Sequence, residues 1–94
     1  MTETSTLTIL LNPPKGFRGR IHFMIGINDE MIGEGYANET IQVTVPAGVN
    51  EVSVLVRNEG TNSMQGSTVL DASRDLSLKI KYGLFSKKAE LVLN

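Results

Sequence analysis

The chain has 94 residues, of which 40% are apolar and 20% charged, with a formal net charge of −1; this is the composition of one ordinary folded domain and excludes a disordered chain. It has no cysteine and one histidine, which excludes disulfides, a thiol nucleophile, iron–sulfur clusters and any site with two imidazoles. The near-neutral charge gives no field that would attract nucleic acid, and no apolar run approaches the about 20 residues of a membrane span.

Apolar and polar residues alternate with a period of two along most of the chain, which is the pattern of strands with one buried face. Six segments show the pattern clearly, and two weaker ones, 31–36 and 64–70, also fit strands. In chain order the expected strands are 6–11, 21–27, 31–36, 41–45, 52–56, 64–70, 76–82 and 88–93. No window of ten residues has a period of 3.6, so we expect no helix longer than one turn.

Turn-forming residues separate these segments. Pro13 and Pro14 end the first strand, because proline cannot donate a hydrogen bond to a ladder. Asn28 and Asp29 suit a tight hairpin, since both residue types tolerate the left-handed conformation. Short strands joined by tight turns predict an all-β fold, an antiparallel β-sandwich or flattened barrel of about seven to eight strands, as a single domain over residues 1–94.

The inward positions of the best-patterned strands define a predicted core. They are Ile21, Phe23, Ile25, Ile41, Val43, Val45, Val52, Val54, Val56, Leu76, Leu78 and Ile80. Charge is uneven along the chain: three cations against one acid in 1–20, seven acids against two cations in 21–74, and four cations against two acids in 75–94. If the two ends share a sheet, the molecule has a basic and an acidic side; the alternative is a mixed solvated surface.

Few residues could carry catalysis. His22 lies on the strand face opposite Ile21 and Phe23, and no serine stands in the context of a nucleophile elbow. The glycines of Gly33-Glu34-Gly35 lead into another strand instead of a helix, so they indicate a bulge or close strand packing and not a phosphate loop. We therefore predict no catalytic residue, and we interpret His22 as a solvent-facing strand residue.

Two groups of acids could offer oxygen ligands to calcium. One comprises Asp29, Glu30 and Glu34, and the other comprises Asp71 and Asp75. Neither group has the spacing of a twelve-residue calcium loop, so we interpret them as turn residues. We predict no bound metal and no cofactor.

A partner contact is predicted near the C-terminus. Leu84 and Phe85 stand beside Lys87 and Lys88, and an exposed apolar pair rimmed by cations would contact a protein or a membrane surface. The alternative is that Leu84 and Phe85 fold back and plug the open end of the sandwich. Val92 is an outward apolar residue on the last expected strand, which has neither proline nor glycine to block edge pairing. These five residues are our candidate partner contacts.

The segments IGINDEMIGEG (25–35) and IQVTVPAGVNEVSVLV (41–56) share a further pattern. A strand ends in a short hairpin at 28–30, the next strand starts at Ile32-Gly33, and a turn at 46–48 opens a strand of alternating valines. This pattern resembles the small bacterial β-domains of the PEGA type, although Asn50 stands where those domains often have histidine and the hairpin glycine is absent. The resemblance implies a noncatalytic sandwich module, usually found at bacterial surfaces or attached to other domains.

The sequence thus favours a noncatalytic bacterial module that binds a protein partner or a second copy of itself as a homo-oligomer. The alternative is a module that binds a small ligand or carbohydrate with loops at one end, for which Tyr36, Tyr82 and Phe85 are the candidate aromatic residues. Glu3 stands where a signal peptide carries lysines, so a cytoplasmic location is expected for the chain as written. A cell-surface location is expected if the chain is part of a longer one.

Overall fold

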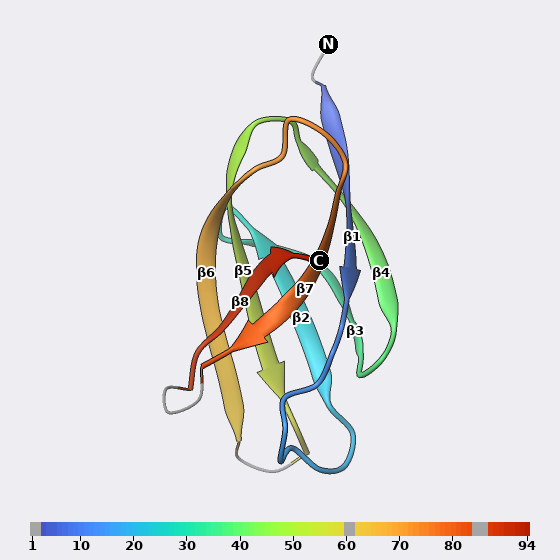
Figure 1. Cartoon of the computed structure of the whole chain (residues 1–94), viewed down its shortest axis with the longest axis vertical. Helices are drawn as coiled ribbons and strands as arrows, with labels where there is room; N and C mark the ends of the chain where they lie inside the picture. Colours follow the sequence, from blue (N-terminus) through green and yellow to red (C-terminus); the bar gives the residue numbers. More distant parts are fainter. Residues whose placement is uncertain (1–2, 60–61, 84–86) are drawn as a thin grey trace.

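A computed structural model of the chain describes residues 3–59, 62–83 and 87–94 (Figure 1). Every regular element in these ranges is a strand, which confirms the predicted all-β fold. The strands are β1 (Thr4–Leu10), β2 (His22–Ile27), β3 (Glu30–Tyr36), β4 (Thr40–Pro46), β5 (Val49–Arg57), β6 (Ser63–Asp71), β7 (Leu76–Tyr82) and β8 (Ala89–Leu93). Within the described residues there is no helix long and apolar enough to cross a membrane.

The strands form two four-stranded sheets. Sheet A has the order β4-β1-β7-β8 and sheet B has the order β3-β2-β5-β6. Neighbouring strands are antiparallel except β1 and β7, which pair in parallel. The expectation of purely antiparallel pairing is therefore wrong for this pair. Turn residues indicate only how strands that follow one another in sequence pair. β1 and β7 come from opposite ends of the chain, so no turn residue could indicate the direction of their pairing.

The core lies between the two sheets. Ten of the twelve predicted core residues are buried, whereas Ile41 and Leu76 are only partly buried. Leu76 is the first residue of β7, and Ile41 lies near the start of β4 at the edge of sheet A. The structure adds Leu7 and Ile9, both with no exposed surface, because β1 is an interior strand of sheet A. Leu11, Ile27, Ala72, Ala89 and Leu91 are also buried.

The hairpin between β2 and β3 has the expected geometry. Asn28 and Asp29 both have positive φ, 49° and 70°, as a two-residue hairpin turn requires. The side-chain Nδ2 of Asn28 donates to Oδ1 of Asn50 at 3.0 Å, and Asn50 is 4% exposed. The Asn50 Nδ2 in turn donates to the carbonyl oxygens of Pro46 at 2.7 Å and Gly48 at 3.1 Å. Asn50 therefore joins two turns at one end of the sandwich.

Glycines allow the two sheets to approach each other along the side where β3 and β4 lie. A Cβ atom on Gly33 would lie 2.8 Å from Cγ1 of Val43, and one on Gly35 would lie 2.7 Å from Cδ1 of Leu11. The ladder between β2 and β3 also shifts register after Ile25. The interpretation of Gly33 and Gly35 as residues of a bulged, closely packed strand is therefore confirmed.

On the opposite side, β6 of sheet B meets the start of β8 of sheet A. Gln65 and Lys88 form a parallel bridge, and the Gln65 backbone nitrogen donates to the Lys87 carbonyl oxygen at 3.3 Å. A Cβ atom on Gly66 would lie 2.1 Å from the carbonyl oxygen of Ala89. Because only glycine fits at this contact, Gly66 allows the two sheets to join there.

Candidate functional site

The outer faces of the two sheets differ in chemistry. Among the described residues, the exposed large hydrophobic side chains are Met31, Tyr36, Val49, Val69 and Leu93. Strand alternation and pairing place all of these except Leu93 on the outer face of sheet B. By contrast, the outer positions of β1 and β4 are mainly hydroxyl and amide residues: Thr6, Thr8, Thr40, Gln42 and Thr44. The outer face of sheet B is therefore the more apolar of the two.

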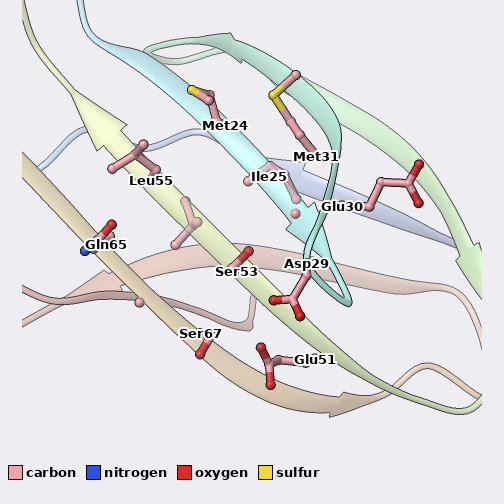
Figure 2. Close-up of a pocket in the computed structure, with 13 residues that line it drawn as sticks. Met24, Ile25, Asp29, Glu30, Met31, Glu51, Ser53, Leu55, Gln65 and Ser67 are labelled. Atoms are coloured by element: carbon pink, nitrogen blue, oxygen red, sulfur yellow. The ribbon is translucent and has the colours of Figure 1, made fainter.

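A shallow hollow of about 570 Å³ lies on the outer face of sheet B (Figure 2). Its floor is one row of residues across the four strands, in which Gly26 pairs with Met31 on one side and with Ser53 on the other. Ser53 pairs in turn with Ser67. Glycine and serine are short, so this row lies below the longer side chains around it. We call this feature the outer hollow.

The outer hollow has an apolar end and an acidic end (Figure 2). Met24 and Leu55 form the next paired row across β2 and β5, and both are half-buried. Asp29 and Glu51 lie toward the other end. The hairpin turn brings Asp29 to this place, and the Asn28 backbone nitrogen fixes it against β5 by donating to the Glu51 carbonyl oxygen at 2.8 Å.

The carboxylates that line the outer hollow are unpaired. Within the described part of the chain, the side chains of Asp29, Glu30 and Glu51 make no hydrogen bond and no ion pair. In the described part of the chain the single ion pair joins His22 and Glu34, which do not line the hollow. Three free carboxylates together with exposed Met31 and half-buried Met24 give the hollow a negative, partly apolar surface.

His22 belongs to a separate cluster on the outer face of sheet B. Its Nε2 lies 3.1 Å from Oε2 of Glu34, and its ring centroid lies 5.2 Å from that of Tyr36. The Arg20 guanidinium lies over the Tyr36 ring, 4.0 Å from its centroid. The pairing of β2 with β3 supplies the carboxylate, which the sequence pattern did not reveal. In the described residues no hydroxyl group hydrogen-bonds to His22, so the cluster has no nucleophile in place.

Of the second group of acids, Asp71 stabilises its own turn, as interpreted from the sequence, whereas Asp75 bonds to a distant strand. Oδ1 of Asp71 accepts a hydrogen bond from the Ser73 backbone nitrogen at 3.1 Å. Oδ1 of Asp75 accepts one from the Thr6 backbone nitrogen at 2.8 Å and so ties the start of β7 to β1. Among the described residues, no group of three or more acids or histidines is arranged to hold a metal ion.

The predicted partner contacts that the structure describes, Lys87, Lys88 and Val92, do not line the outer hollow. Leu84 and Phe85 fall outside the described residues. Lys87 and Lys88 are exposed just before β8, and Val92 is half-buried on the outer face of sheet A, opposite Lys79 on β7. Of the described candidates, Val92 belongs to sheet A and Lys87 and Lys88 come just before its last strand, so the sequence analysis missed the hollow itself. Met24 and Leu55, apolar at the outward positions of their strands, are the signal that could have indicated it.

A second hollow, of about 680 Å³, is lined in part by residues of the connection from β1 to β2. The Asn12 side chain pairs with the Ile80 backbone there through two hydrogen bonds of 2.8 Å. The Tyr82 hydroxyl donates to the Asn12 carbonyl oxygen at 2.6 Å. Burial raises the pKa of Tyr82 well above the ordinary value, which keeps the hydroxyl a donor. Phe17 and Met64 also line this loop-end hollow.

No family model, curated protein or solved structure matches the chain. The resemblance to PEGA-type domains therefore stays a prediction. The chemistry of the two hollows is the basis on which function can be inferred.

Proposed function

We propose that this chain is a noncatalytic β-sandwich module that binds another protein through the outer face of sheet B. The observation that carries the proposal is the outer hollow, in which Met24, Met31 and Leu55 lie beside three unpaired carboxylates. Apolar side chains gathered on one face and rimmed by polar groups are typical of a protein-binding surface. Methionine adapts its shape to a partner at low cost.

The electrostatics of the outer hollow indicate which class of partner it would accept. Asp29, Glu30 and Glu51 would repel the phosphates of nucleic acid, whereas they would attract lysine or arginine. Exposed apolar residues continue beyond the hollow to Val69, which pairs with Glu51 on the neighbouring strand. A surface that extends over several strands fits a protein better than a small molecule.

The noncatalytic part of the proposal has its own support. A general base needs a reacting hydroxyl or water held in place. Among the described residues, the His22 side chain hydrogen-bonds only to Glu34, and its ring lies beside the ring of Tyr36. The resemblance of residues 25–56 to PEGA-type domains agrees with a bacterial binding module. The carboxylates of Asp71 and Asp75 are used in hydrogen bonds to backbone nitrogens.

A second candidate function is binding of a small ligand at the loop-end hollow, because Phe17, Met64 and Tyr82 give it apolar and aromatic walls. Carbohydrate binding has less support. The Tyr36 ring is covered by Arg20, the Tyr82 hydroxyl is bonded to Asn12, and the third candidate aromatic residue, Phe85, lies outside the described residues. Saturable protection of the chain against heat by a sugar or another small molecule would favour this second function.

The proposed function is tested by capture of proteins from the source cell with three immobilised chains. They are the wild type, Leu55→Glu on the outer face of sheet B, and Thr44→Glu on the outer face of sheet A as the matched control. We expect a protein retained by the wild type and by Thr44→Glu but lost with Leu55→Glu, because the added carboxylate blocks the apolar end of the hollow. Equal retention by all three chains would place binding elsewhere and contradict the proposal.

A further inference from the structure

The outer face of sheet A carries a surface complementary to the outer hollow. On the β7–β8 hairpin, Lys79 pairs with Val92 and Lys81 pairs with Glu90 across the two strands. Lys88 precedes buried Ala89, so strand alternation places its side chain on the same outer face as Val92. Together these residues and the half-buried Leu10 of β1 form a cationic and apolar patch, which we call the lysine patch: Leu10, Lys79, Lys81, Lys88 and Val92.

The lysine patch and the outer hollow match in both charge and polarity. The hollow has three unpaired carboxylates beside Met24, Met31 and Leu55. The patch has three lysines beside Leu10 and Val92, and Glu90 lies next to it, opposite Lys81. No lysine or arginine forms an ion pair with a carboxylate anywhere in the described ranges, although the chain has nine such cations and ten acids. The carboxylates of the hollow and the lysines of the patch therefore lie on opposite outer faces and do not pair within one molecule, although Arg20 and Arg57 also lie on the outer face of sheet B, outside the hollow.

We infer that the protein bound at the outer hollow is a second copy of this chain, which presents its lysine patch. This inference rests on the proposed function and names the partner. Docking of hollow on hollow would bring six carboxylates together, and docking of patch on patch would bring six lysines together, so both symmetric arrangements are repulsive. Hollow on patch brings opposite charges together and covers apolar residues on both sides.

This arrangement determines the kind of assembly. The two contacting surfaces are different, so each bound copy leaves one hollow and one patch free for further copies. The chain therefore assembles head to tail by stacking of sandwiches, and its average mass rises continuously with concentration instead of stopping at a dimer. Salt screens the charges at the rim of the contact and weakens the assembly.

Charge reversal tests the inference. One chain carries Glu30→Lys and Glu51→Lys in the hollow, which leaves the hairpin residue Asp29 unchanged. The other carries Lys79→Glu and Lys88→Glu in the patch, which leaves Lys81 opposite Glu90. Sedimentation velocity is measured for the wild type, for each variant and for an equimolar mixture of the two variants. We expect each variant to associate at least about tenfold more weakly than the wild type, and the mixture to recover the association.

The control has Glu3→Lys and Glu59→Lys, which change the net charge as the hollow variant does but lie outside both surfaces. It is expected to associate like the wild type. A wild type that stays a single chain up to millimolar concentration overturns the inference, and so does a mixture that does not recover association. The proposed function is contradicted by a different result: in the capture experiment, Leu55→Glu retains the same proteins as the wild type. If the wild type stays monomeric but captures a protein that Leu55→Glu does not, the hollow binds a partner other than a second copy. That result overturns the inference and leaves the proposed function standing.

Discussion

Gly66 and Asn50 show how single residues hold the two sheets in place. Gly66 lies against the Ala89 carbonyl oxygen, where any side chain would collide with backbone. Asn50 is buried and makes all its side-chain hydrogen bonds to the turns that contain Asn28 and Gly48. Neither role is visible in the sequence, because alternation only assigns a residue to a face. The partner across the sandwich is set by tertiary contacts.

Gly66→Ala is expected to lower the free energy of unfolding by roughly 1–3 kcal/mol. The added methyl group would lie 2.1 Å from the carbonyl oxygen of Ala89, so β6 and β8 must move apart. Urea denaturation measures the change. The matched control is Ser67→Ala on the exposed side of the same strand, expected within about 0.5 kcal/mol of the wild type. Equal stability of the two variants would show that β6 does not need glycine at this contact.

Tyr82 gives the stability a dependence on alkaline pH. Burial raises its pKa in the folded chain above the value in the unfolded chain, so the folded state holds the proton more tightly. The contribution is fully present below the unfolded pKa of about 10 and is lost as the pH rises toward the folded pKa. Between pH 9 and pH 12, roughly the window around that unfolded pKa, the wild type is expected to lose more stability than Tyr82→Phe. Parallel curves for the two chains would contradict this assignment.

At the scale of elements, the sequence predicted where the strands lie but not all of their partners. Period-two alternation places each strand within a few residues, and the Asn28-Asp29 hairpin is found as expected. The parallel pairing of β1 with β7 was not predictable, because it depends on a crossover from one sheet to the other. The outer hollow depends on three pairings that align Met31, Gly26, Ser53 and Ser67, so it too could not be read from one strand.

Val54→Ala tests the burial of the central strand of sheet B. Val54 is 2% exposed on β5, between β2 and β6, so loss of its two methyl groups should cost roughly 1–3 kcal/mol through lost burial and a partial cavity. Glu51→Ala on the same strand is the exposed control and should change stability by less than about 0.5 kcal/mol. Thermal unfolding followed by circular dichroism compares the two. A larger loss for Glu51→Ala than for Val54→Ala would contradict the assigned core.

At the scale of the whole molecule, the distribution of charge is the feature with the greatest consequence for function. The sequence allows a basic and an acidic side, if the two chain ends share a sheet, and a mixed solvated surface as the alternative. β1, β7 and β8 share sheet A, and its lysines come from β7 and from the residues just before β8. The acids of the β2–β3 hairpin and β5 lie on sheet B. Two surfaces of opposite charge on opposite faces, the outer hollow and the lysine patch, each with apolar residues, are the basis of the proposed binding and of the head-to-tail contact.

The most direct test is an amide correlation spectrum of the nitrogen-15-labelled chain while unlabelled chain is added. The account predicts concentration-dependent shifts at two separate places and weaker shifts at high salt. One place is the outer hollow, reported by Met31, Ser53 and Leu55, and the other is the lysine patch, reported by Lys79 and Val92. Shifts confined to the loop-end hollow, or no shift at any concentration, would contradict the account.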